Sequence, residues 1–289
     1  MADETKRETL VIRIDWWLGR VIAMTGAITE VAKKRPVKVI TSWPLVFWGN
    51  PYIKSVHGLD DRNLFVDVIR WNDYFELEPY TDSKFFNDAE NWLKVAARHL
   101  WVEWPTPQPC LFLAEHEKIN NVLCENCSPI LFQPFGSTMQ ANGSDKSYRS
   151  IPVDAAQYMA DKMIEMGYTP YVVERNDQPK LNWCQQLTVQ DLRWLVSLAD
   201  RYPVVGCDSS MHHAAKAFGK KALVLRAGTD AERYWYESNI NMREHPFVAF
   251  TPMRLPMNSF DLDICNQHTN KFTKKFLDKA LTNLPTLFK

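Results

Sequence analysis

The sequence has no apolar stretch that approaches the roughly 20 residues needed to cross a bilayer as a helix. Its first ten residues, MADETKRETL, are polar and lack the apolar segment of a signal peptide. We therefore expect a cytoplasmic protein. The chain also has no net charge, because 34 basic side chains balance 34 acidic ones. No overall field attracts nucleic acid or an anionic membrane.

The six cysteines show no arrangement that is typical of a metal site. Cys124 and Cys127 form a single C-x-x-C, and the other four are scattered. A structural zinc site needs a second Cys or His pair at short spacing, and none follows here. We expect two reduced thiols at this place and no metal site.

Charged and aromatic residues are distributed unevenly along the chain. Residues 1–55 carry nine Lys/Arg against five Asp/Glu, whereas residues 60–90 carry three against nine. Eight of the eleven tryptophans lie between Trp16 and Trp104. Tryptophan packs in cores, and it also stacks on sugars and nucleic-acid bases. Both uses remain open for the N-terminal half.

The N-terminal half shows the hydrophobic pattern of an α/β domain. Strands are predicted at residues 9–14, 37–41 and 64–69. A helix is predicted through Ala23, Ala27 and Val31, and Pro36 ends it. Residues 84–101 have apolar positions near a 3.6-residue period and predict a second helix, before the proline-rich connector 105–109.

The C-terminal half alternates strands and helices more regularly. Strands are predicted at residues 129–133, 169–174, 203–206 and 222–225. Helices are predicted to begin near Pro152, at an N-cap Thr188 and at Asp208. This alternation predicts parallel sheets with helices on both faces.

The fold class is therefore α/β, with two Rossmann-like domains over residues 1–125 and 126–289. The last helix could pack back on the first domain. In such sheets ligands bind at the carboxyl ends of the strands. This rule selects the loops 15–20, 134–149, 174–180, 206–213 and 226–232, and it predicts a cleft between the domains.

The segment from Val204 to Glu232 carries the clearest chemistry. A strand ends at Gly206, and Asp208 with two serines opens a helix. The first turn of a helix offers unpaired N–H groups and the positive end of its dipole, which suit a diphosphate. Asp208 could then bind sugar hydroxyls and His213 could donate to phosphate. The alternative is that Asp208 or Ser209 only caps the helix.

This segment resembles the motif D-[TS]-G-x-x-H-x-A-A-A-x-G-[KR]-P, followed by G-x-T-[DS]-P-E, of the bacterial heptosyltransferases (glycosyltransferase family nine). Residues 187–200 resemble the family's L-[ST]-[LI]-x-[EQ]-L motif, and 135–137 with 149–154 resemble its G-[AS]-S…K-x-W-P-x-E pattern. Residues 12–21 resemble I-R-x-S-S-[LM]-G-D-V, and Gly49–Pro51 its G-N-P. The likeness is good over residues 129–232 and weaker over residues 8–56. It implies the GT-B fold and an inverting transfer from a nucleotide-diphosphate sugar, bound mainly by the second domain.

The resemblance also implies roles for individual residues of the second domain. Arg149 stands where the family has its phosphate-binding lysine, with Lys146 as a nearby second candidate. Glu174 matches an acidic residue that contacts the donor's ribose. The motif that holds diphosphate and sugar covers Asp208, Ser209, Ser210, Met211 and His213, with Ser210 in place of the family's glycine. The family uses no metal or other cofactor, and no D-x-D near these loops contradicts that.

The first loop departs from the family pattern. Arg20 stands where the family has its catalytic aspartate, and Asp15 lies five residues earlier. Asp15 could act as the general base, or it could cap the next turn. Asp60 and Asp61 are the next candidates. Trp16 and Trp17 would contact the acceptor, and Arg20 would then indicate an anionic acceptor.

Three readings of function follow. The acceptor of an active transferase could be a glycan or lipid-linked saccharide, as in the family. It could instead be a hydroxymethylated base in DNA, since the basic residues 1–55 and tryptophans such as Trp43 and Trp48 suit a flipped base. The third reading is a non-catalytic nucleotide-sugar-binding protein, which the replacement of the family base by Arg20 favours.

Overall fold

The computed structural model describes residues 8–88, 90–103, 108–119, 123–124, 127–143, 145, 149–227, 236–244 and 271–288. The chain forms two compact units, Met1–Ala114 and Glu115–Lys289. The sequence places the domain boundary somewhat later, after residue 125. Among the described residues, no helix is both long and apolar enough to cross a membrane.

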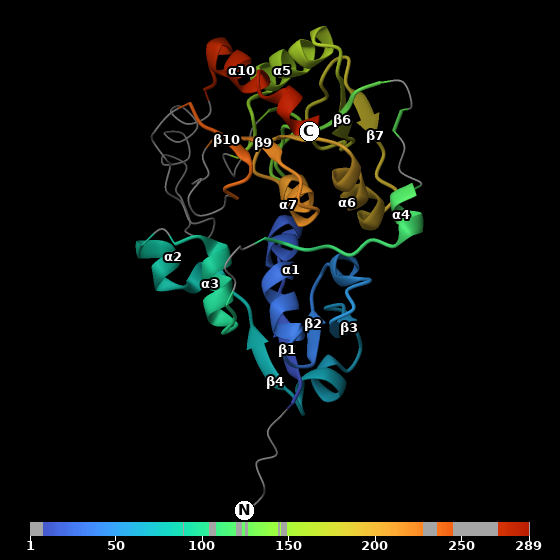
Figure 1. Ribbon diagram of the computed structural model, residues 1–289, viewed down its shortest axis with the longest axis vertical. Helices are drawn as coiled ribbons and strands as arrows, with labels where there is room; N and C mark the ends of the chain where they lie inside the picture. The colour runs from blue at the N-terminus through green and yellow to red at the C-terminus, as the bar shows by residue number, and fades with distance from the viewer. Residues whose placement is uncertain are drawn as a thin grey trace, which may run out of the picture. The chain divides into compact units, whose positions relative to one another are not determined.

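Unit 1 is built on a four-stranded parallel sheet in the order β3-β2-β1-β4. The strands are β1 (Leu10–Arg13), β2 (Val37–Ile40), β3 (Ile53–His57) and β4 (Asp73–Glu76). Its helices are α1 (Leu18–Ala32), α2 (Ser83–Asn87) and α3 (Trp92–His99), with short turns η1 (Pro44–Phe47) and η3 (Pro79–Thr81). Figure 1 shows α1 beside β1 and β2. Eleven of its fifteen residues are buried, because α1 is apolar on most of its circumference.

Two predictions for unit 1 are wrong. Leu64–Ile69 is not a strand but a π-helix, η2, whose Val68 packs on Val11 and Ile40 of the sheet. The predicted helix over residues 84–101 is two helices. The Asn91 side chain accepts a hydrogen bond from Leu93 N at 3.0 Å and starts α3 as a separate element.

Unit 2 is built on a six-stranded parallel sheet in the order β10-β9-β8-β5-β6-β7. The strands are β5 (Pro129–Gln133), β6 (Thr169–Val173), β7 (Gln185–Leu187), β8 (Val204–Gly206), β9 (Ala222–Leu225) and β10 (Ile240–Met242). The helices are α4 (Glu115–Ile119), α5 (Val153–Glu165), α6 (Leu192–Arg201), α7 (Ser210–Ala217) and α10 (Lys274–Leu281), followed by η4 (Leu284–Phe288). Figure 1 shows α5 and α10 on one face of this sheet and α6 and α7 on the other.

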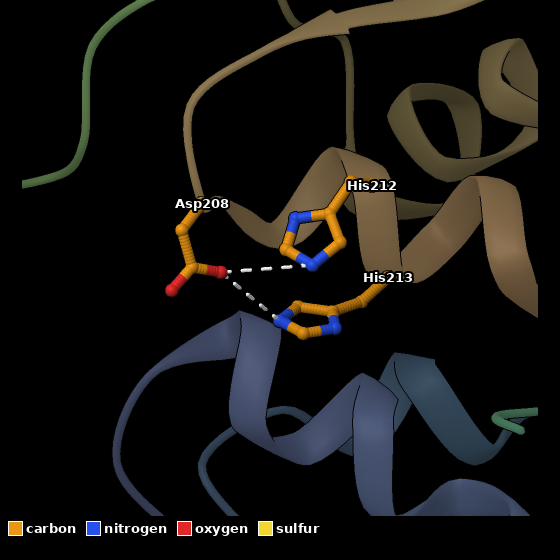
Figure 2. A group of neighbouring side chains, drawn as sticks. All are labelled: Asp208, His212 and His213. Carbon is orange, nitrogen blue, oxygen red and sulfur yellow. Dashed lines mark ion pairs between the residues drawn. The ribbon is translucent and has the colours of Figure 1, made fainter. Parts of the chain in front are cut away.

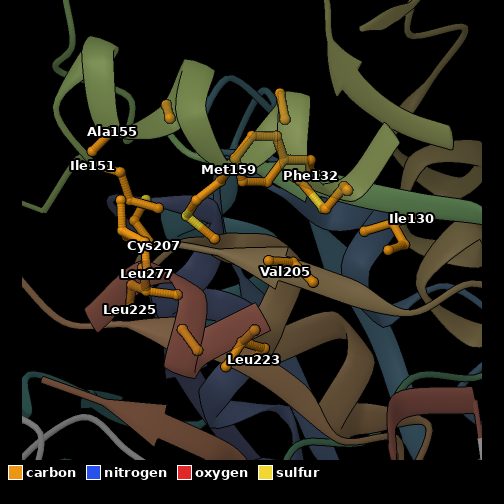
Figure 3. Packing of buried hydrophobic residues seen from close by; sticks show 14 of the residues in the cluster. Ile130, Phe132, Ile151, Ala155, Met159, Val205, Cys207, Leu223, Leu225 and Leu277 are labelled. Carbon is orange, nitrogen blue, oxygen red and sulfur yellow. The ribbon is translucent and has the colours of Figure 1, made fainter. Parts of the chain in front are cut away.

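The core of unit 2 lies between the sheet and the α5–α10 pair. Phe132, Val205 and Leu223 face Met159 of α5, as Figure 3 shows, and all four side chains are buried. Burial of each such side chain contributes about 1.5–3 kcal/mol to folding. The buried face of α10, which includes Leu277, belongs to this same core. The last helix therefore packs within unit 2.

Two local details of unit 2 differ from the sequence prediction. Asp191, and not Thr188, caps α6, because its carboxylate accepts a hydrogen bond from Trp194 N at 2.7 Å. The structure also joins Cys124 and Cys127 in a disulfide, where two reduced thiols were expected.

Gly206 lets the end of β8 approach β5 closely. A Cβ atom at this position would lie 2.1 Å from the carbonyl oxygen of Gln133, which is far inside contact distance. The next residue, Cys207, donates its N–H to that oxygen at 2.9 Å. The loop after β8 is thus fixed against β5 at its first residue.

Candidate functional site

Asp208 lies in the loop that connects β8 to α7, at the carboxyl edge of the unit 2 sheet. Its side chain is buried and faces two consecutive histidines of α7 (Figure 2). Asp208 Oδ1 lies 3.6 Å from His212 Nε2 and 3.9 Å from His213 Nε2. A buried carboxylate is rare unless a positive charge or hydrogen-bond donors accompany it, so Asp208 requires such partners in its surroundings.

The first turn of α7 has its own capping arrangement. Ser209 occupies the N-cap position, and its backbone N–H donates to Nδ1 of His212 at 3.1 Å. Asp208 is therefore not the cap of α7. The N-cap of α7 is therefore Ser209. The Asp208 carboxylate instead belongs to a buried cluster with His212 and His213.

Arg226 supplies the positive charge next to Asp208. It follows β9 directly, its side chain is fully buried, and its Nη1 lies 3.4 Å from Asp208 Oδ2. Its Nη2 donates to Asn241 Oδ1 at 3.3 Å. The buried ion pair of Asp208 and Arg226 thus lies at the carboxyl ends of β8 and β9.

Both histidines are neutral at neutral pH. Burial lowers the pKa of His213 to about 4, Asp208 opposes this shift, and Arg226 and Arg149 reinforce it. Burial also lowers the pKa of His212 well below its usual value, with His213 and Arg226 acting in the same direction. The buried hydroxyl of Tyr236 lies 2.7 Å from His213 Nδ1. Burial and the charge of Asp208 raise the pKa of this phenol, which stays protonated.

Arg149 belongs to the same region of unit 2. It is buried, and its charge contributes to the lowered pKa of both histidines and opposes the rise that burial causes in the pKa of Cys207. Asp145 accepts hydrogen bonds from Thr138 Oγ1 at 2.5 Å and from the N–H of Ser150, the residue after Arg149, at 2.8 Å. The other phosphate candidate, Lys146, lies outside the described residues.

The remaining predicted donor residues occupy different surroundings. Glu174 follows β6 and accepts a hydrogen bond from Thr188 Oγ1 at 2.9 Å. Ser210 is half-buried at the start of α7, and Met211 is buried beside it. The structure therefore gathers Asp208, Arg149 and His213 into one cluster, while Glu174 lies at the end of another strand of the sheet.

Within the described residues, Asp208, His212 and His213 form one group whose ligand atoms all lie within 4.8 Å of one another, close enough to suggest a metal site. The chemistry of the donors does not fit this use. His212 Nδ1 accepts the N–H of Ser209, so the neutral ring carries its proton on Nε2 and offers no lone pair there. The Arg226 guanidinium also already neutralises Asp208.

The first-loop residues of unit 1 lie at the carboxyl ends of β1 and β2. Asp15 is half-buried and accepts a hydrogen bond from the Ser42 hydroxyl. Trp16 and Trp17 follow with 54% and 38% of their surfaces exposed. Trp16 has a left-handed backbone (φ 88°), and its carbonyl oxygen accepts a hydrogen bond from Trp43 Nε1 at 2.8 Å. A partly accessible carboxylate and two accessible aromatic rings thus share this loop.

Arg20 does not have the surroundings expected of an acceptor-binding residue. It is buried, with its Nη1 3.1 Å from Glu78 Oε2 and its Nη2 2.7 Å from the Leu77 carbonyl oxygen. The Tyr80 ring lies 5.1 Å from the guanidinium carbon. Arg20 is an internal ion-pair partner, and the interpretation that it signals an anionic acceptor is not supported.

Asp60 and Asp61 lie in the exposed loop after β3. Asp61 Oδ2 lies 3.3 Å from Nδ1 of His57, and both aspartates are exposed. They remain alternatives to Asp15.

Three residues of the cluster were not singled out from the sequence: His212, Arg226 and Tyr236. Arg226 had a usable signal, because an arginine directly after the buried strand Ala222–Leu225 needs a buried partner. His212 had none beyond its place next to His213. Tyr236 reaches the cluster only through the tertiary fold.

Two parallel Rossmann-like sheets, with a buried polar cluster at the carboxyl edge of the second, define an α/β protein of the two-domain GT-B type. No protein-family model matches the sequence, and no curated protein matches it. The structure, however, resembles solved glycosyltransferases over almost its whole length.

One similar structure is TibC of enterotoxigenic E. coli, described as an iron-containing dodecameric glycosyltransferase. It has a TM-score of 0.68 at 12% identity, over 98% of this chain and 77% of that chain. The E. coli ADP-heptose lps heptosyltransferase II has a TM-score of 0.63 at 14% identity, over 96% and 99%. A family nine glycosyltransferase of Veillonella parvula has 0.62 at 13%, over 98% and 99%. The fold implied by the family-nine resemblance is therefore confirmed.

Proposed function

We propose that this protein is an inverting, metal-independent glycosyltransferase, which moves a sugar from a nucleotide-diphosphate donor to an acceptor hydroxyl. The observation that carries the proposal is a fold shared with heptosyltransferases over almost the whole chain, with a buried charged cluster on the loop where the sequence resembles the family's donor motif. Because the identity is only 14%, the site residues and not the likeness must decide the chemistry.

Unit 2 is proposed to bind the donor. Arg149 and the first turn of α7 would hold the diphosphate, since a guanidinium and backbone N–H groups both bind phosphate oxygens. Asp208 would accept hydrogen bonds from the sugar hydroxyls, and Glu174 from the ribose. Arg226, with its Nη1 3.4 Å from Oδ2, would hold the Asp208 carboxylate in place.

Asp15 of unit 1 is proposed as the general base. Its carboxylate would take the proton of the acceptor hydroxyl while the acceptor oxygen forms a bond to the anomeric carbon. The bond from that carbon to the diphosphate breaks, and the nucleoside diphosphate leaves. Attack from the opposite side inverts the configuration at the anomeric carbon. The exposed rings of Trp16 and Trp17 would contact the acceptor.

Metal independence is proposed from the charges of unit 2. Arg149 and Arg226 are both buried there and would offset the charge that develops on the leaving diphosphate. His212 would also be a poor metal ligand, because its Nδ1 accepts the Ser209 N–H and its Nε2 then carries the proton of the neutral ring.

The proposed acceptor is a saccharide, free or lipid-linked. A structural neighbour is named as a lipopolysaccharide heptosyltransferase, and others are described in complex with an ADP-heptose or ADP. An ADP-linked heptose is therefore the first donor to test. A DNA acceptor and the non-catalytic reading are alternative outcomes of the same experiment.

Thermal-shift and calorimetric titrations with a panel of nucleotide sugars test donor binding. A donor at 100 times its Kd stabilises the folded state by about 2.7 kcal/mol. Asp208→Ala should abolish this stabilisation, while Glu165→Ala, at the exposed end of α5 in the same unit, should not.

Release of nucleoside diphosphate is then measured with oligosaccharide acceptors and with hydroxymethylated DNA. Release that depends on an oligosaccharide supports the proposal, whereas release with DNA alone supports the DNA reading. Tight donor binding without release under any condition would make the protein a non-catalytic binder.

A further inference from the structure

Unit 1 contains a cavity of about 480 Å³ beside the second half of α1. Glu30 and Lys33 line it from the helix, Tyr52 from the turn before β3, and Phe112 from the segment after α3. Small-molecule sites commonly have volumes of about 300–1,000 Å³. Two of the lining side chains, Tyr52 and Glu103, are exposed, so a ligand can enter the cavity from solvent.

The cavity lies at the opposite end of α1 from the first loop. Asp15 precedes this helix at the carboxyl ends of the strands, whereas Lys33 caps its C-terminus and Tyr52 directly precedes β3. A helix of fifteen residues is about 22 Å long. The cavity is therefore separate from the proposed general base and lies outside the proposed reaction.

Two buried threonines of α1 hold the walls of the cavity in place. Cys110 donates its backbone N–H to Thr25 Oγ1 at 2.9 Å, and its Sγ lies 3.2 Å from Thr29 Oγ1. On the other wall, Asn50 Nδ2 donates to Thr29 Oγ1 at 2.8 Å, and Asn50 Oδ1 accepts from Tyr52 N at 3.0 Å. Since hydrogen bonds join both walls to one helix, the cavity is formed before any ligand binds, as most small-molecule sites are.

Two aromatic rings form the apolar part of the cavity. The ring centroids of Tyr52 and Phe112 are 6.4 Å apart, with an angle of 64° between the ring planes. The Tyr52 side chain is 44% exposed, so its ring is accessible to a ligand. An accessible aromatic face suits the C–H face of a sugar ring.

The polar side chains of the cavity offer both donors and acceptors. Lys33 Nζ lies 2.6 Å from Glu30 Oε1 and 5.5 Å from the centroid of the Tyr52 ring. An ammonium has three donors and a carboxylate has several acceptor positions, so this pair can also bind the hydroxyl groups of a ligand. Glu103 and Gln108, which line the cavity as well, add a carboxylate and an amide.

The charges of these side chains favour a neutral ligand. The lining residues carry two carboxylates and one ammonium, so an anion would meet an excess of negative charge. A cation would have to compete with Lys33 for the Tyr52 ring and for Glu30. A neutral compound with many hydroxyl groups uses the ring, the donors and the acceptors together.

We propose that this cavity is a saccharide-binding site of unit 1, apart from the Asp15 loop. The Tyr52 ring packs on one face of a neutral sugar, and Glu103 and the Lys33–Glu30 pair bind its hydroxyl groups. The site goes beyond the proposed function and does not rest on it, because binding here requires neither a nucleotide donor nor a general base.

Calorimetric titration of the whole protein with lactose, maltose, cellobiose and N-acetylglucosamine, without a donor, tests the site. At least one of these sugars should bind, and the sugar that binds most tightly is used for the variants. Tyr52→Ala should weaken its binding about 10-fold, because an aromatic contact is lost. Tyr52→Phe keeps the ring and should bind like wild type. Tyr74→Ala, which removes a tyrosine of similar exposure from the same unit, is the matched control.

Two further variants separate this cavity from the first loop. Glu103→Ala removes an exposed carboxylate and should weaken binding of the same sugar about 10-fold, because a hydrogen bond to a charged group is lost. Trp16→Ala should leave the affinity unchanged, since Trp16 belongs to the loop at the other end of α1.

The thiol of Cys110 gives an independent measurement of where the sugar binds. Cys110 lines the cavity and is half-buried, and burial raises the pKa of its thiol. Its alkylation by iodoacetamide at alkaline pH, followed by mass spectrometry, should become several-fold slower when the sugar is saturating. Cys184, a half-buried thiol of unit 2, should react at the same rate with and without the sugar.

Absence of binding for all four sugars would overturn the proposal, and so would equal affinity of Tyr52→Ala and wild type. A loss of affinity in Trp16→Ala, with Tyr52→Ala unchanged, would place the sugar at the first loop instead. Binding of tetramethylammonium chloride or sodium phosphate that depends on Tyr52, without binding of any sugar, would show that the ligand class is wrong. None of these results concerns donor binding by unit 2, so the proposed function is tested separately.

Discussion

Arg226 and Asp208 form an ion pair that is almost wholly removed from solvent, with 3.4 Å between Nη1 and Oδ2. The two residues come from loops after different strands, β9 and β8, so their pairing joins the loops on which the proposed donor site is built. Loss of one partner from a buried pair leaves the other charge uncompensated, which costs more than the pair itself contributes.

Arg226→Met should therefore reduce the free energy of unfolding by about 3–5 kcal/mol, as measured by denaturant titration. The double variant Arg226→Met with Asp208→Asn should recover part of this loss, because no charge is then left buried. Strictly additive losses would show that the two side chains do not interact in solution.

The buried histidines predict a fall in stability on mild acidification. The pKa of His213 drops from 6.5 in the unfolded chain to about 4 in the folded one, so between these values the unfolded chain binds a proton that the folded chain does not. Stability is thus full above pH 6.5 and decreases as the pH falls to about 4, by about 3 kcal/mol for this group. His212 acts in the same direction.

Unfolding titrations between pH 7.5 and about 4 measure this slope. His213→Gln should flatten it, whereas His116→Gln, at an exposed position of α4, should not. The same slope in His213→Gln as in wild type would show that His213 does not contribute to it.

Arg149→Ala should weaken the binding of the nucleoside diphosphate product about 10–100-fold, because one charge-assisted contact is worth about 1.5–3 kcal/mol. Arg149→Lys should restore part of the affinity, since an ammonium replaces the guanidinium fork by a point charge. Arg201→Ala, at the exposed last residue of α6, is the matched control. Unchanged affinity in Arg149→Ala together with lost affinity in Lys146→Ala would assign the phosphate to Lys146 instead.

Asp15→Asn keeps the size of the side chain but cannot take a proton. It should lower kcat by roughly 10²–10⁴ with little change in donor affinity. Asp60→Asn and Asp61→Asn serve as controls and should keep wild-type turnover. A normal kcat in Asp15→Asn with a loss in either of the other two would move the base to the loop after β3.

Removal of metal ions should leave transfer unchanged. After treatment with a chelator and its removal, the rate should equal that of untreated enzyme, because the proposed charges on the diphosphate side come from Arg149 and Arg226. Added Mg²⁺, Zn²⁺ or Fe²⁺ should not raise the rate. A lost rate that one of these ions restores would contradict the metal-independent mechanism.

The sequence predicted most of the strands and helices of unit 2 that have a clear apolar pattern. In unit 2 the strands β5, β6, β8 and β9 were found, because continuous apolar runs between helices are typical of a parallel sheet. The strand β7 was missed, since two of its three residues are exposed and polar. In unit 1 the apolar run Leu64–Ile69 was taken for a strand, although only Val68 of this run is buried, where it packs on the face of the sheet.

Only the part of the site whose residues lie close together in the sequence was predictable. Asp208 and His213 were found because they share one loop and one helix start. Arg226 and Tyr236 meet them only in the folded unit, where β9 lies beside β8 and Tyr236 contacts His213. The role of Arg20 also could not be read from its own surroundings in the sequence, because Glu78 lies 58 residues away.

The buried pair of Arg20 and Glu78 restricts how this chain can be altered. Substituting Arg20 by aspartate would recreate the resemblance motif on paper, but it would remove the charged partner of Glu78 and add a second carboxylate to the interior of unit 1. Their repulsion and the cost of desolvation would act against folding before any gain in catalysis could appear. A redesign toward that motif must therefore replace Glu78 before Arg20 or together with it.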